Sequence, residues 1–123
     1  MTLIEAINMV DALKPNAYTQ YEKIDWLSTL DGMVKRFVID THEGGEGIVF
    51  SGYDDETPLD TELLVKAPYE DIYIAWLESK IDYHNGEYVK YNNSITRYND
   101  IYQGYCNDYN RTHMPKGSQI KYF

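Results

Sequence analysis

Residues 72–77 read Ile-Tyr-Ile-Ala-Trp-Leu and contain no charged side chain. Their strong hydrogen-bonding side-chain groups are limited to the hydroxyl of Tyr73 and the indole N–H of Trp76. A helix that is apolar on nearly every side is stable only when other elements surround it. The stretch therefore predicts a buried central helix against which the other elements pack.

The ends of this central helix carry their own signals. Pro68 suits the first turn of a helix, and Glu70 and Asp71 favour the positive end of its dipole. Asn85-Gly86 is typical of a helix C-terminus, since glycine readily adopts the left-handed backbone needed there. A new segment is expected to begin at Glu87.

Two helices are predicted before the central one, each opened by a capping box. Thr2 with Glu5 starts a short helix that Pro15-Asn16 ends, and Thr19 with Glu22 starts a second helix of about 20 residues. The apolar face of the first is expected to consist of Leu3, Ile7, Val10 and Leu13. That of the second is expected to consist of Trp26, Leu27, Leu30, Met33, Val34, Phe37 and Val38.

Between the second helix and the central helix, the helical period disappears over residues 40–67. Glycines and a proline punctuate this excursion, which also holds two short apolar runs at 48–50 and 63–65. We expect a long loop or a β-hairpin. Structureless segments of this length are uncommon in compact domains unless they perform a task or order against a partner.

The chain has 13 tyrosines, and 7 of them fall between Tyr83 and Tyr109. Most belong to a heptad seam with alternating steps of three and four residues, which predicts a fourth helix. The seam consists of Tyr88, Tyr91, Ile95, Tyr98, Tyr102, Tyr105 and Tyr109. Proline and glycine then stop the helix, and residues 112–123 are expected to form an extended C-terminal tail.

These elements predict a mainly α fold, a small bundle of about four helices. With 123 residues there is room for a single domain over 1–123 with one modest core. The single cysteine, Cys106, excludes an internal disulfide and a cysteine-based zinc site within one chain. No apolar stretch approaches the roughly 20 residues of a membrane span, and no signal peptide is expected, so we expect no membrane contact and a cytoplasmic origin.

The net charge is −9 and is unevenly distributed. Residues 1–86 carry 17 acidic and 6 basic side chains, a net charge of −11, whereas residues 87–123 carry 3 and 5, a net charge of +2. Acidic surfaces repel polyanions, which disfavours sequence-specific binding to DNA or RNA.

Tyrosine combines a large apolar area with a hydroxyl that requires a partner, so the seam admits three interpretations. It packs against the chain's own helices, it contacts neighbouring subunits, or it stacks on single-stranded nucleic acid. The acidic net charge disfavours the third interpretation.

Signals for catalysis or cofactor binding are weak. The glycine-rich turn Asp40–Glu46 gathers carboxylates around His42, but its spacing fits no established metal-ligand pattern. Cys106 and His113 lie seven residues apart on one predicted helix face, but neighbouring residues of the seam have the same spacing without any catalytic role. No phosphate-binding loop, dinucleotide fingerprint or His-Glu-x-x-His motif occurs. We therefore expect no enzyme, no cofactor and no metal, with a small metal-dependent hydrolase using the His42 region as a minor alternative.

Several stretches resemble small proteins encoded in the structural module of Firmicutes phages and prophages. They are residues 10–16, 26–28 and 39–44 within the run 1–46, then 60–65, 85–88, 90–94 and 109–117. The last of these reads Tyr-Asn-Arg-Thr-His-Met-Pro-Lys-Gly. The likeness covers nearly the whole chain and is to head-tail connector proteins, also called adaptor or head-completion proteins.

The resemblance implies a helical virion protein of the phage neck, assembled in the host cytoplasm. Such a subunit joins a ring, typically of twelve copies, between the portal protein and a tail-side neck or stopper protein. The ring extends the channel through which DNA passes, and the family has no catalytic residues to transfer. A tail-assembly chaperone, or another phage structural binding module, is the alternative.

Two sets of candidate contact residues follow. The tyrosine seam from Tyr88 to Tyr109 is the candidate subunit interface. The tail is the candidate portal-docking segment, because a helix-stopping motif precedes its terminal aromatic residues. The candidate portal-docking residues are Met114, Pro115, Lys116, Ile120, Tyr122 and Phe123.

Overall fold

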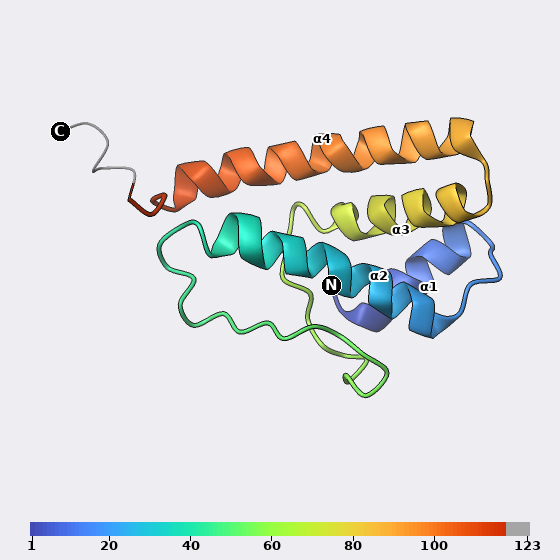
Figure 1. Ribbon diagram of the computed structural model, residues 1–123, viewed down its shortest axis with the longest axis horizontal. Helices are drawn as coiled ribbons and strands as arrows, with labels where there is room; N and C mark the ends of the chain where they lie inside the picture. Colours follow the sequence, from blue (N-terminus) through green and yellow to red (C-terminus); the bar gives the residue numbers. More distant parts are fainter. Residues whose placement is uncertain (118–123) are drawn as a thin grey trace.

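The computed structural model describes residues 1–117 as a bundle of four α-helices (Figure 1). The helices are α1 (Leu3–Leu13), α2 (Gln20–Val34), α3 (Asp71–His84) and α4 (Tyr88–Thr112), and a π-helical turn, η1 (Lys35–Ile39), extends α2. The predicted mainly α class and the number of helices are confirmed.

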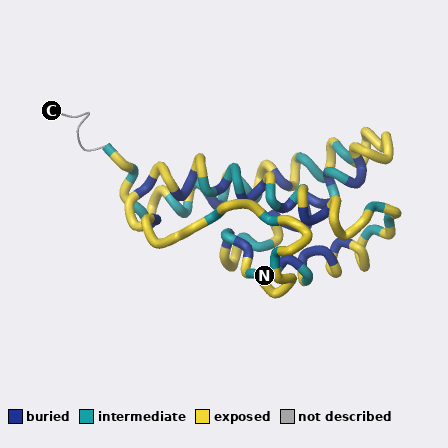
Figure 2. Tube along the Cα trace, turned by 60° about the horizontal axis from the view of Figure 1, so that its bottom comes forward, coloured by how far each residue is buried: buried dark blue, intermediate teal, exposed yellow. Residues whose placement is uncertain are grey.

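The central helix is α3, which α4 covers on one side and α1 and α2 cover on the other (Figure 1). All six residues of 72–77 are buried, as the apolar stretch predicted. Buried residues in Figure 2 lie on the sides of the helices that face one another, and exposed residues follow the outer side of α4.

The predicted helix ends are largely confirmed. Both capping boxes form, since Thr2 caps α1 with Glu5 and Thr19 caps α2 with Glu22. After α3, the Gly86 N–H donates to the Tyr83 carbonyl at 3.0 Å and the Glu87 N–H to that of Asp82 at 2.9 Å. These two bonds are a Schellman motif, with Gly86 at φ +75°.

Three details of the predicted helices are wrong. Leu13 was expected on the apolar face of the first helix, but it lies at the end of α1 and is 65% exposed. Phe37 was placed on the apolar face of the second helix, but its side chain is 58% exposed. The cause is η1, where the Asp40 N–H donates to the Lys35 carbonyl five residues back and changes the direction of the following side chains. Pro68 lies before α3, which begins at Asp71, and not in its first turn.

Between η1 and α3 the chain forms a long loop, and no strand occurs among residues 1–117. The sequence left a long loop and a β-hairpin open for this excursion, and the structure forms the loop. Its pairing is reduced to two isolated bridges, Thr2 with Glu62 and His42 with Pro115. Leu63 and Val65 of the second apolar run are fully buried, so this run contributes to the core and does not pair with the first run.

Candidate interaction surfaces

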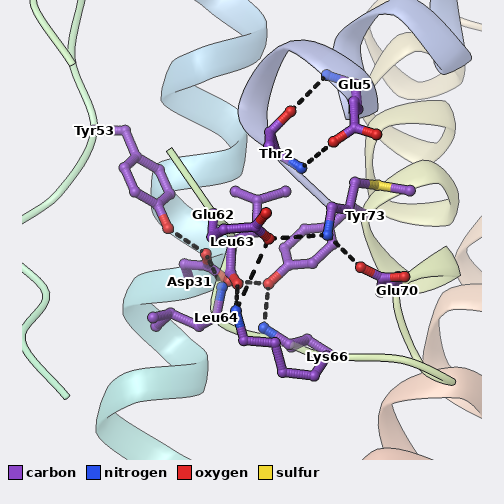
Figure 3. Close-up of polar contacts among 12 residues, drawn as sticks. Thr2, Glu5, Asp31, Tyr53, Glu62, Leu63, Leu64, Lys66, Glu70 and Tyr73 are labelled. Carbon is purple, nitrogen blue, oxygen red and sulfur yellow. Dashed lines mark hydrogen bonds and ion pairs between the residues drawn. The ribbon is translucent and has the colours of Figure 1, made fainter. Parts of the chain in front are cut away.

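The long loop is fixed to the helices by the buried carboxylate of Asp31 on α2 (Figure 3). The hydroxyl groups of Tyr53 and Tyr73 donate to it at 2.5 and 2.6 Å, and the Leu64 N–H donates at 3.0 Å. The Tyr73 hydroxyl also accepts from the Val65 N–H at 2.7 Å. Four hydrogen bonds thus join the loop, α2 and α3 at one buried point.

Burial sets the ionisation of this cluster. It raises the pKa of Asp31, although the tyrosine hydroxyls and the Leu64 N–H oppose the shift. Burial and the neighbouring carboxylate also raise the pKa of Tyr53 and Tyr73. Both tyrosines therefore remain protonated and keep donating to Asp31.

The middle of the tyrosine seam packs against the chain's own α3 and loop. Tyr98 and Tyr105 are buried; the Tyr98 ring lies 4.9 Å from that of Trp76, and the Tyr105 ring 5.9 Å from that of Tyr69. Tyr102 is half-buried beside Tyr98, and burial raises its pKa to about 12. This part of the seam therefore packs against the chain's own elements, the first of the three interpretations.

The N-terminal end of the seam stays accessible. Tyr88 is 62% exposed, and its ring lies 6.1 Å from that of Tyr83, which is itself exposed. Tyr91 is half-buried on the other side of Tyr83, with ring centres 5.4 Å apart, and Ile95 is half-buried on the next turn. Of the candidate interface residues, Tyr88 has the most exposed side chain.

At the other end of the seam, Tyr109 packs on two histidines. Its ring is nearly perpendicular to that of His42, with ring centres 5.0 Å apart, and stacks on that of His113, with ring centres 3.8 Å apart. His42 is buried, with Nδ1 2.7 Å from the Val38 carbonyl oxygen and Nε2 2.6 Å from Oδ1 of Asn110. The loop turn is therefore attached to α4 through the His42 side chain.

The beginning of the C-terminal tail pairs with the same loop turn. The Glu43 N–H donates to the Met114 carbonyl at 2.8 Å, and the Lys116 N–H donates to the Thr41 carbonyl at 2.9 Å. Met114, Pro115 and Lys116 were candidates for portal docking, and their backbone lies against residues 41–43 of the same chain. The other candidates, Ile120, Tyr122 and Phe123, lie outside the described residues.

The outer face of α4 carries an uncharged polar stripe that the sequence analysis missed. Its members are exposed and follow one another at three- or four-residue steps, a spacing that could have been found in the sequence beside the tyrosine seam. We call it the carboxamide stripe because five of its six members are carboxamides, Asn92, Asn99, Gln103, Asn107 and Asn110, and the sixth is Thr96. Carboxamides both donate and accept hydrogen bonds, so this face can contact a protein surface without a charge of its own.

Shallow grooves flank α4. One of about 590 Å³ lies between residues 68–71 and α4, with Arg97 and Ile101 in its lining. A second, of about 400 Å³, runs between α3 and α4 beside Trp76 and Tyr91. Within residues 1–117 no cluster of three histidine, cysteine or acidic side chains is arranged to hold a metal ion. The helices formed by this part of the chain are too short or too polar to cross a membrane.

No protein-family model, no curated protein and no solved structure matches this chain.

Proposed function

We propose that the protein is a structural subunit of a phage neck, which forms a ring between the portal protein and the tail and extends the DNA channel. The proposal rests on the expected resemblance to head-tail connector proteins of stretches distributed from residues 10–16 to 109–117. The described part of the chain is compatible with this role, since it is a compact helical unit whose long loop is tied to the core.

The distribution of charge supports assembly into a ring. Copies of a chain with a net charge of −9 repel one another, so a contact face needs little charge of its own. The carboxamide stripe meets this requirement, and the exposed Tyr88 lies at the same end of α4 as Asn92. We place the contact with neighbouring subunits on this face and on the exposed end of the seam, because Tyr98 and Tyr105 are buried within the chain.

The acidic N-terminal part supports the passage of DNA. Residues 1–86 carry a net charge of −11, and attraction to phosphates is what would retain DNA in a channel. A ring with acidic walls lets DNA pass without binding it, so we expect proximity to channel DNA without specific contacts.

Sedimentation of the protein alone and mixed with the cognate portal ring tests this function. Co-sedimentation with the portal, saturating at a fixed ratio of subunits, is expected. If the protein ignores an intact portal but sediments with a tail protein, it is instead a tail-assembly chaperone.

A truncation tests whether the tail docks on the portal. Deleting residues 118–123 removes Ile120, Tyr122 and Phe123 but keeps the pairing of Met114 and Lys116 with residues 41–43. The truncated protein should lose portal binding while its helical circular dichroism stays unchanged. Full binding by the truncated protein would refute tail docking without affecting the ring proposal.

A further inference from the structure

One stretch of the long loop has a backbone without hydrogen-bond partners. Within residues 1–117, the N–H groups of Val49, Phe50, Ser51 and Gly52 donate to no other group of the chain. The next N–H, that of Tyr53, donates to Oγ of Ser28 at 2.9 Å. Four consecutive free amides on a surface segment can pair with a strand from another molecule.

The structure holds this stretch in place at both ends. The Ile48 N–H closes a turn on the Gly45 carbonyl at 3.0 Å, and the Thr57 N–H closes another on that of Asp54 at 3.2 Å. Between these turns the chain runs alongside α2 in the opposite direction (Figure 1), with the Phe50 ring against Gly32. An incoming strand would thus meet a segment whose ends are already fixed, which lowers the entropic cost of binding.

The side chains of the stretch suit a strand and not a solvated loop. Ile48, Val49 and Phe50 are β-branched or aromatic, and such residues favour pleated, half-buried surfaces. The Val49 side chain is nevertheless 86% exposed and that of Ile48 37% exposed. The residues from 47 to 53 carry no charge, whereas Glu46 precedes them and the acidic run 54–56 follows.

We propose that residues 47–51 form a docking strand for an extended segment of another protein that has β-branched residues in its centre and lysine or arginine at its ends. Gly52, at φ +96°, turns the backbone away from the extended conformation and ends the strand. The free amides of the stretch would form hydrogen bonds with the backbone of the incoming segment. The acidic side chains on both sides of the stretch would favour a segment with basic residues at its ends. A second copy of this chain fits less well, because self-pairing would bring Glu46 of one copy towards the acidic run 54–56 of the other. The proposal does not depend on the phage function.

The test uses the full chain and two synthetic peptides of the same core, Lys-Lys-Thr-Val-Tyr-Val-Thr-Lys-Lys and Glu-Glu-Thr-Val-Tyr-Val-Thr-Glu-Glu. Amide hydrogen exchange is followed at residues 49–52. The lysine-flanked peptide should slow exchange at alternate amides at least tenfold, because an added strand pairs with one edge only. The glutamate-flanked peptide should leave exchange unchanged, and added salt should weaken the protection.

Val49→Lys, which places a charge in the docking strand, should abolish protection. Val89→Lys is the matched control, since Val89 is 78% exposed on α4 and lies outside the proposed site. The proposal is overturned if neither peptide slows exchange, if both do so equally, or if Val49→Lys binds as well as the control. Protection that rises with protein concentration alone would also overturn it, because the partner would then be a second copy.

Discussion

Tyr73 has two hydrogen bonds to satisfy, and both partners are buried. Its hydroxyl donates to Asp31 and accepts from the Val65 N–H (Figure 3). Tyr53 makes one bond to the same carboxylate from a half-buried position. Leaving a buried donor or acceptor without a partner costs more free energy than the net contribution of one hydrogen bond. The Tyr73 hydroxyl should therefore contribute more to stability than that of Tyr53.

Tyr73→Phe should therefore lower the free energy of unfolding by about 3 kcal/mol, from roughly 1–3 kcal/mol for each buried group left unsatisfied. Tyr53→Phe is the matched control and should cost about 1 kcal/mol, since water can replace its hydroxyl. Urea denaturation of both variants measures the difference. Equal losses would contradict the greater contribution assigned to the Tyr73 hydroxyl.

The pKa of Asp31 makes the stability of the fold depend on pH. Burial raises it in the folded protein, so the folded state takes up a proton at a higher pH than the unfolded chain. The resulting stabilisation is fully present below the ordinary pKa of about 3.9 and is lost as the pH rises through the raised value. The stability of the wild type minus that of Asp31→Asn should thus decrease as the pH rises above about 4.

Denaturation of both proteins across this range measures that slope, in which the titration of all other groups cancels. A difference that increases with pH would show that the hydrogen bonds, and not burial, set the pKa of Asp31.

Lys14 neutralises a buried carboxylate. Its ammonium contacts both oxygens of Asp82 at 2.7 Å, and that carboxylate is fully buried and also accepts from the Ser94 hydroxyl. Lys14→Met should cost at least about 2 kcal/mol, because it leaves a buried charge without its partner. Lys90→Met, which removes an exposed pair with Glu87, should change stability by less than about 0.5 kcal/mol. Similar losses in thermal denaturation would contradict this assignment.

At the scale of the elements, the turn between α3 and α4 depends on Gly86, whose φ of +75° other residues adopt only with strain. Gly86→Ala should lower the free energy of unfolding by roughly 1–2 kcal/mol. Gly47→Ala is the control, because Gly47 is outside the left-handed region and a Cβ atom there meets nothing within 4 Å. Guanidinium denaturation measures the free energy of unfolding of both variants. A Gly86→Ala variant as stable as the wild type would contradict the Schellman motif.

Local signals in the sequence account for most of the elements. The capping boxes at Thr2 and Thr19 and the cap at Gly86 each involve residues only a few positions apart, so they could be predicted. The π-helical turn could not, because it alters the path of a helix whose apolar pattern continues without interruption. Phe37 consequently points outward although its spacing predicted a buried position.

At the scale of the whole molecule, the contacts that fix the loop join residues far apart in the chain. Asp31 accepts hydrogen bonds from Tyr53, which is 22 positions away in the sequence, and from Tyr73, which is 42 positions away. No local sequence pattern indicates such pairs. The tyrosine seam predicted a contact face, but the sequence did not determine which element it contacts. The structure turns Tyr98 and Tyr105 towards the chain's own core and leaves the carboxamide stripe outside.

The proposed function requires assembly with the portal, so imaging of the protein mixed with its cognate portal tests it. Negative-stain class averages should show an additional ring, coaxial with the portal and attached to one of its faces. Portal particles that remain bare in the presence of excess folded protein would contradict the proposed place in the phage neck.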